Sequence, residues 1–140
     1  MKLTRVHIIK AATCGGLLDG LDVTVRALPD GAERFDPLCL VGSNGTGKSQ
    51  FLQVIAEAFQ VVFYACAREE ERMRGNEELE FELEYVIRPA PDRENVLVRL
   101  SRRSEGKRRP IRVERKDALD CVECPLTARE SRALLPSRII

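Results

Sequence analysis

Residues 42–49 have the composition of a phosphate-binding loop. They read Gly-Ser-Asn-Gly-Thr-Gly-Lys-Ser and match the pattern G-x-x-x-x-G-K-[ST] in full. Its glycines permit backbone angles at which main-chain N–H groups converge on an anion. In such loops the lysine reaches the β- and γ-phosphates of a nucleotide, and the hydroxyl after it ligates Mg²⁺. We therefore predict nucleotide contacts from Gly42, Asn44, Gly45, Thr46, Gly47, Lys48, Ser49 and Gln50, with Ser49 as the Mg²⁺ ligand.

The segments on either side of this loop have the character that a phosphate loop requires. Residues 37–41, Pro-Leu-Cys-Leu-Val, form a continuous apolar run that favours a strand buried on both faces. After Lys48, apolar residues recur three or four positions apart, which predicts a helix to about residue 68. Such a helix adds unpaired N-terminal donors and the positive end of its dipole to the loop.

Period-two alternation predicts most of the remaining structure. In residues 79–87 apolar and charged side chains alternate, which is typical of a half-buried antiparallel strand. The alternation recurs at 96–100 and more weakly at 111–113, so we predict a three-stranded antiparallel meander. The sequence also predicts strands at 3–9 and 21–25, with a turn-rich segment between them, and a short helix at 128–135.

Composition sets broad limits on the class of protein. The chain has 140 residues, of which 44% are hydrophobic and 32% charged, as in an ordinary globular domain. No stretch approaches the roughly 20 apolar residues of a membrane span, and the N-terminus lacks the apolar core of a secretory signal. We therefore predict a cytoplasmic protein without membrane association.

The cysteines do not predict a metal site or disulfides. Their count of five is odd, and Cys39 and Cys66 lie in apolar runs where they act as small hydrophobic residues. Cys121 and Cys124 have zinc-like spacing, but no second pair follows to complete a tetrahedral site. We favour local packing for these two side chains.

Charge is unevenly distributed along the second half of the chain. Residues 69–84 are strongly acidic, and residues 99–116 are strongly basic. A basic cluster at one hairpin tip could bind DNA phosphates in a salt-dependent way. Alternatively, the cluster is solvated, or pairs with the acidic segment or a partner subunit, and no aromatic residue interleaves it to stack on a base. We favour the second interpretation for the cluster, which consists of Arg102, Arg103, Lys107, Arg108 and Arg109.

The order of these features resembles a known family. Two N-terminal strands, a third strand into the phosphate loop, a long helix and an antiparallel meander are similar to the first lobe of ABC-type ATPases. Asn44 within the loop resembles the SMC and RecF-like branch, whose loops often read G-x-N-G-x-G-K-S. Segments 14–23 and 35–41 look like those of bacterial AAA/ABC-type ATPases associated with restriction and phage defence.

The resemblance implies a fold and an activity. The fold would be an α/β lobe of α+β character: a P-loop NTPase with a parallel core strand at 37–41 and an antiparallel β meander. It would divide into a phosphate-loop core at 1–75, the meander at 76–117 and the start of a further segment at 118–140. The implied activity is binding of ATP with Mg²⁺, followed by head-to-head association as a homodimer or heteromeric complex. Residues 10–13 would lie beside the nucleotide.

Several motifs of the family are missing from this sequence. No apolar strand ending in Asp-Glu follows the loop, and neither a Ser-Gly-Gly-like signature nor the family's Q-loop glutamine is visible. Hydrolysis needs charge stabilisation and an oriented water in addition to a phosphate cradle. We therefore expect this chain to bind ATP but to turn it over slowly or not at all, as the N-terminal part of a longer ATPase would.

Two alternatives remain open. The chain could be a complete, non-catalytic module that senses ATP or docks a partner. It could also be another P-loop enzyme such as a kinase or GTPase, although it lacks the Asn-Lys-x-Asp motif that reads guanine.

Overall fold

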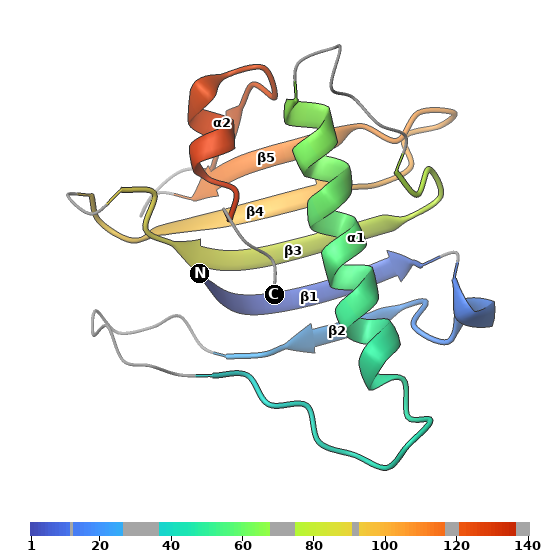
Figure 1. Cartoon of the computed structure of the whole chain (residues 1–140). Coiled ribbons are helices and arrows are strands. Elements are labelled where there is room, and N and C mark those ends of the chain that lie inside the picture. Colours follow the sequence, from blue (N-terminus) through green and yellow to red (C-terminus); the bar gives the residue numbers. More distant parts are fainter. Residues whose placement is uncertain (12, 27–36, 68–74, 91–92, 117–120, 137–140) are drawn as a thin grey trace.

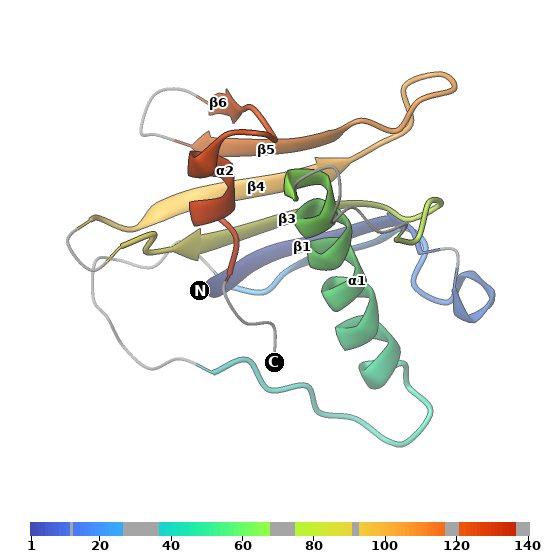
Figure 2. The ribbon, with the colours of Figure 1, turned by 45° about the horizontal axis from the view of Figure 1, so that its top comes forward.

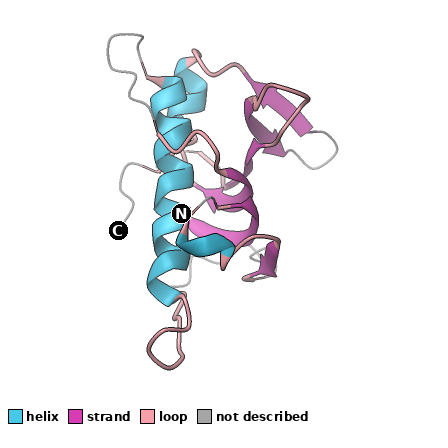
Figure 3. Cartoon of the chain, turned by 90° about the vertical axis from the view of Figure 1, so that its right-hand side faces the viewer, coloured by secondary structure: helices cyan, strands magenta, loops and turns pink. Residues whose placement is uncertain are grey.

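The chain forms one antiparallel sheet with helices on one of its faces. The computed structural model describes residues 1–11, 13–26, 37–67, 75–90, 93–116 and 121–136. Within these ranges six strands make up the sheet, and two α-helices pack against it (Figure 1). The side view in Figure 3 shows both helices on the same side of the sheet.

The strands pair in the order β2-β1-β3-β4-β5-β6, and every described pairing is antiparallel. The two predicted N-terminal strands and the predicted meander are confirmed, and one further strand, β6, continues the meander at the sheet edge (Figure 2). The strands are β1 (Lys2–Lys10), β2 (Leu21–Thr24), β3 (Glu80–Ile87), β4 (Val96–Arg102), β5 (Ile111–Lys116) and β6 (Cys121–Cys124).

The prediction of a P-loop NTPase fold with a parallel core strand is wrong. Residues 37–41, expected to be that strand, follow an irregular path outside the sheet, and Val41 is 91% exposed. A continuous apolar run becomes a buried strand only beside strands that pair with its backbone and layers that cover both its faces. The described strands pair among themselves, and none of them pairs with this run.

Helix α1 (Lys48–Cys66) supplies most of the buried side chains of the helical layer. Its buried side chains recur three or four positions apart, which places them on one side of the helix. The ring of Phe59 packs on that of Tyr85 in β3, with 5.4 Å between ring centroids. Neither α1 nor another helix in the described ranges is long and apolar enough to span a membrane.

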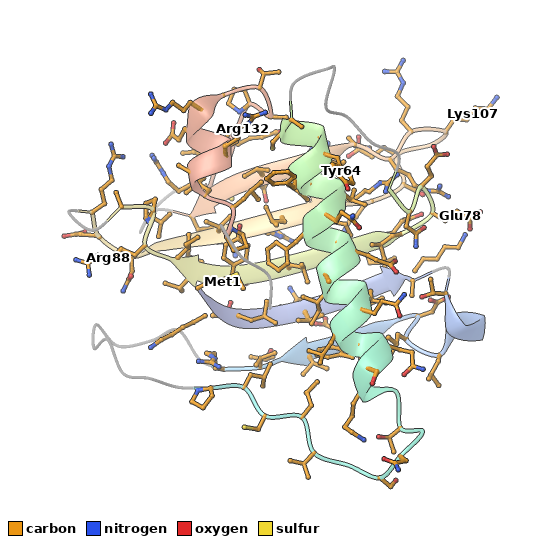
Figure 4. All side chains as sticks on the ribbon, in the orientation of Figure 1. Met1, Tyr64, Glu78, Arg88, Lys107 and Arg132 are labelled. Atoms are coloured by element: carbon orange, nitrogen blue, oxygen red, sulfur yellow. The ribbon has the colours of Figure 1, made fainter. Side chains whose placement is uncertain are left out.

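Helix α2 (Arg129–Ala133) is attached to both the sheet and α1, and confirms the short helix predicted near the C-terminus. The Tyr85 hydroxyl donates a hydrogen bond of 2.7 Å to the Leu134 carbonyl, and burial raises the pKa of that hydroxyl. Arg132 Nε donates to the carbonyl of Cys66 at 2.7 Å, where α1 ends (Figure 4). This bond satisfies one of the carbonyls that a helix leaves unpaired at its C-terminus.

The face of the sheet away from the helices, here called the outer face, is held by ion pairs between neighbouring strands. Arg5, Glu84, Arg99 and Glu114 lie directly opposite one another across four strands, so that charges of opposite sign alternate. Glu82 is 4% exposed and binds Arg99 at 2.7 Å. Arg103 also pairs with Glu82, at 2.8 Å. Burial alone would raise the pKa of Glu82, but the Arg103 hydrogen bond and the Arg99 and Arg103 charges hold it below its ordinary value.

Glu80 joins the start of β3 to the hairpin between β4 and β5. Its carboxylate accepts hydrogen bonds from Ser104 Oγ at 2.6 Å, from the Ser104 N–H at 3.0 Å and from Arg109 Nε at 3.0 Å. The Ser104 hydroxyl is the largest cause of the lowered pKa of Glu80, and it outweighs the effect of burial. A carboxyl whose pKa is lowered by folding stabilises the fold above its ordinary pKa and loses that contribution as the pH falls through the folded-state pKa.

We predict that Glu80→Gln lowers the free energy of unfolding at pH 7 by about 1–3 kcal/mol, since it removes charge-assisted hydrogen bonds from a buried group. The difference from the parent should shrink as the pH falls below the ordinary Glu value of about 4.3. Below that pH the unfolded parent takes up a proton on Glu80, which the folded parent, with its lowered pKa, takes up only at still lower pH. Urea unfolding at pH 7 and at about pH 3 measures both quantities. Glu123→Gln, on the exposed edge strand, is the matched control and should change stability little. A difference that is the same at both pH values would contradict this role for Glu80.

Candidate phosphate-binding site

The predicted phosphate loop leads directly into the N-terminus of α1. Gly45 and Gly47 adopt left-handed backbone angles, with φ of 84° and 86°, which other residues rarely adopt. Gly47 is the residue before the first turn of the helix, and its carbonyl accepts the N–H of Phe51 at 2.8 Å. The predicted succession of loop and helix is thus confirmed, although the strand expected before them is not formed.

The N-terminus of α1 is open to a bound anion. No side chain caps it, and no acidic residue lies in its first turn. A helix start without a cap leaves main-chain N–H groups unpaired, at the positive end of the helix dipole. A 19-residue helix with such a start favours a negatively charged group close to Ser49 and Gln50.

The Lys48 side chain folds back over the loop. Its Nζ donates hydrogen bonds to the carbonyls of Gly42, at 2.8 Å, and Ser43, at 2.6 Å. Thr46 Oγ1 also donates to the Ser43 carbonyl, at 2.9 Å. A Cβ at Gly42 would lie 3.1 Å from Thr46 Oγ1, so a larger residue there would require the Thr46 hydroxyl to shift by a few tenths of an ångström. The ammonium group is therefore held directly above the backbone of the glycine-rich loop.

The structure gathers the predicted contact residues at one end of α1. Gly42 through Thr46 are exposed, as is Ser49 in the first helical turn. Lys48 and Gln50 are half-buried, and Gly47 is buried. The exposed hydroxyl of Ser49 and the ammonium of Lys48 thus share one short stretch with the main-chain donors of the helix.

The turn at residues 13–20 was not predicted to touch the phosphate loop. A Cβ at Gly47 would lie 3.3 Å from Leu17 Cδ2 and 3.9 Å from Leu18 Cδ2, so the turn lies against the last glycine of the loop. Of the segment at 10–13, expected to lie beside the nucleotide, Ala11 is buried and its N–H donates to Asp19 Oδ1 at 2.7 Å. The sequence contained one signal for this contact, which is the pair of leucines within a glycine-rich turn. Apolar side chains in a turn commonly pack on another part of the chain.

The described residues contain no group of three or more His, Cys, Asp or Glu side chains placed to hold a metal ion. Cys121 is exposed whereas Cys124 is buried, since positions three apart on a strand point to opposite faces. The prediction of local packing thus holds for Cys124, which joins the hydrophobic core, and not for the exposed Cys121. Mg²⁺ usually keeps several waters and takes one or two protein ligands together with phosphate oxygens. The Ser49 hydroxyl fits that role.

The basic cluster at the β4–β5 hairpin is largely engaged within the chain. Arg102 donates to the carbonyls of Asn76 and Glu77 at 2.7 and 2.8 Å, and burial lowers its pKa. Arg109 binds Glu80 and the Glu77 carbonyl, and Arg103 pairs with Glu82 as described above. Lys107 lies at the hairpin tip (Figure 4), and both Lys107 and Arg108 are exposed. The pairing of this cluster with residues 76–82 bears out our interpretation, and DNA binding stays an untested prediction.

Replacement of Gly47 by alanine tests the conformation of the loop. We predict that Gly47→Ala lowers the free energy of unfolding by about 1–2 kcal/mol, the cost of a left-handed backbone for a residue with a Cβ. Gly45→Ala carries a similar backbone cost, because its φ is also left-handed, but nothing lies within 4 Å of a Cβ there. It should therefore cost less than Gly47→Ala, in which the new Cβ would lie 3.3 Å from Leu17 Cδ2. Urea unfolding of both variants provides the measurement. If Gly47→Ala unfolds at the same urea concentration as the parent, the helix start described here is wrong.

Comparison of the whole chain with protein-family models, with curated proteins and with solved structures finds no match.

Proposed function

We propose that this chain binds the phosphate groups of ATP, together with Mg²⁺, at residues 42–49. The observation that carries the proposal is the junction of the glycine-rich loop with the uncapped start of α1, over which the Lys48 ammonium is folded. The sequence pattern alone also occurs by chance. Here it coincides with left-handed glycines, unpaired helix donors and a lysine held over the loop.

Each group in the loop has a distinct role in this proposal. The main-chain N–H groups at the start of α1 donate to phosphate oxygens, and the helix dipole favours their negative charge. Lys48 exchanges its two carbonyl partners for phosphate oxygens, with which a charged donor forms stronger hydrogen bonds. Ser49 and the phosphates hold Mg²⁺, which neutralises part of the phosphate charge.

The proposal is for binding, and hydrolysis by this chain alone is not part of it. In-line attack on a phosphate needs a residue that orients the water and further charge stabilisation. The motifs that supply these groups in ABC-type ATPases are not visible in this sequence.

We extend the proposal to nucleotide-dependent association with a second copy or another subunit, in a defence or DNA-processing complex. Its support is the sequence resemblance, together with exposed apolar side chains on both sides of the loop. Val41 precedes the loop, and Leu52, in the second turn of α1, is 54% exposed. Apolar side chains grouped around a binding loop favour a partner that covers them.

Replacement of the loop lysine tests the binding proposal. We predict that the parent binds Mg-ATP in isothermal titration calorimetry and that Lys48→Ala weakens binding about 10- to 150-fold, which corresponds to a charge-assisted hydrogen bond of about 1.5–3 kcal/mol. Lys107→Ala, which removes an exposed lysine at the hairpin tip, is the matched control and should bind as the parent does. Equal affinity of Lys48→Ala and the parent would refute the phosphate site.

The metal role of Ser49 has its own test. We predict that removal of Mg²⁺ with EDTA weakens ATP binding by the parent, because the metal no longer links the phosphates to the Ser49 hydroxyl. In Ser49→Ala, affinity with Mg²⁺ should fall toward the metal-free value. Ser43→Ala is the control, since Ser43 contributes its carbonyl rather than its hydroxyl to the loop contacts. The same dependence on Mg²⁺ in Ser49→Ala and the parent would exclude Ser49 as a ligand.

A further inference from the structure

The turn at residues 13–20 places an apolar side chain at the edge of the candidate phosphate site. Leu17 and Leu18 both lie against Gly47, the last glycine of the loop. Leu18 is partly buried and packs on the hydrophobic core, whereas Leu17 is 61% exposed. The first leucine thus remains accessible beside the loop, while the second anchors the turn.

We infer that Leu17 packs against the nucleoside of the bound nucleotide, and that the site therefore discriminates little between adenine and guanine. The inference rests on the proposed function, because the phosphate loop must first hold the triphosphate. Once the phosphates lie in the loop, the nucleoside extends past its rim. Leu17 provides apolar surface there that a sugar or a purine face can cover.

The position of Leu17 is maintained by the turn itself. Gly15, Gly16 and Gly20 adopt left-handed backbone angles, which shape the turn. Asp19 Oδ1 accepts the Ala11 N–H at 2.7 Å and so ties the turn to the end of β1. A surface held in place before binding loses little conformational entropy when a ligand covers it.

The expected lack of base selectivity follows from the chemistry of the side chain. The leucine side chain has neither a hydrogen-bond donor nor an acceptor. It can pack on any flat apolar surface but cannot distinguish the hydrogen-bonding groups at the edge of a base. Sites that reject a close analogue strongly do so because buried polar groups are left unpaired, and an apolar contact gives much weaker discrimination. In the same turn, Asp19 Oδ1 already accepts a hydrogen bond from the N–H of Ala11, the residue after β1.

The experiment compares three probes, each with Mg²⁺, by isothermal titration calorimetry: ATP, GTP and inorganic tripolyphosphate. Tripolyphosphate carries the phosphates without a nucleoside. We expect Leu17→Ala to weaken the binding of ATP and GTP by about 3- to 10-fold, because a partly buried leucine contact is lost. Tripolyphosphate should be affected by less than about twofold, and in the parent ATP and GTP should bind within about fivefold of each other.

Two further variants serve as controls for Leu17→Ala. Leu17→Met keeps an apolar side chain of similar volume and should bind ATP as the parent does. Val122→Ala shortens an exposed apolar side chain on edge strand β6, away from the loop, and should change none of the affinities. Because Leu17 is exposed, Leu17→Ala should fold as the parent does.

The outcomes separate this inference from the proposed function. If Lys48→Ala weakens all three probes but Leu17→Ala binds ATP as the parent does, the phosphate site stands and the role of Leu17 is overturned. If Leu17→Ala weakens tripolyphosphate as much as ATP, Leu17 supports the loop and does not contact the nucleoside. A preference of more than about 100-fold for one purine would show that hydrogen bonds recognise the base. It would overturn the inference that the site discriminates little between adenine and guanine. If the parent binds none of the probes, both proposals fail.

Discussion

The packing of α1 against the antiparallel sheet determines where everything else in this structure lies. Phe59 packs against Tyr85 with the two rings tilted relative to each other, and the buried side of the helix extends from Phe51 to Cys66. Burial of each such side chain contributes about 1.5–3 kcal/mol, so the helix axis is fixed relative to the strands. Its N-terminus then presents the glycine-rich loop at one end of the molecule. Its C-terminus meets α2, which Tyr85 and Arg132 hold in place.

The outer face of the sheet is stabilised by a different interaction. Alternating acidic and basic side chains lie across neighbouring strands, and long arginine side chains cover Glu82 so that it is nearly inaccessible to water. A buried carboxylate is tolerated because paired cations compensate for the loss of hydration. The arginines that looked available for nucleic acid are therefore mostly needed within the chain. The same pairing joins the β4–β5 hairpin to the beginning of β3 through Glu80 and Arg109.

Local patterns predicted the elements well. Alternation in 79–87 predicted a half-buried strand, and β3 does form there. Residues on both of its faces are buried, however, because arginine side chains in and just after the neighbouring strand cover Glu82 on the outer face. The glycines before Lys48 predicted the start of α1 at the residue where it occurs. The apolar run at 37–41 gave a wrong prediction of a buried strand, since its composition shows a preference for burial and not whether neighbouring strands are present. The contact of Leu17 with Gly47 was missed because it joins two loops that are far apart in the chain.

The sequence by itself determined the chemistry of the candidate site and the type of most elements. Both depend on residues that are close together in the sequence, within one turn or one strand. Over such short distances the number of residues between two side chains fixes their relative positions. Tertiary structure alone decided that residues 37–41 remain outside the sheet, that Arg102 and Arg109 turn inward, and that Leu17 lies beside the phosphate loop. Each of these outcomes depends on which distant segment supplies a hydrogen-bond partner or an apolar surface, and that is settled only when the whole chain packs.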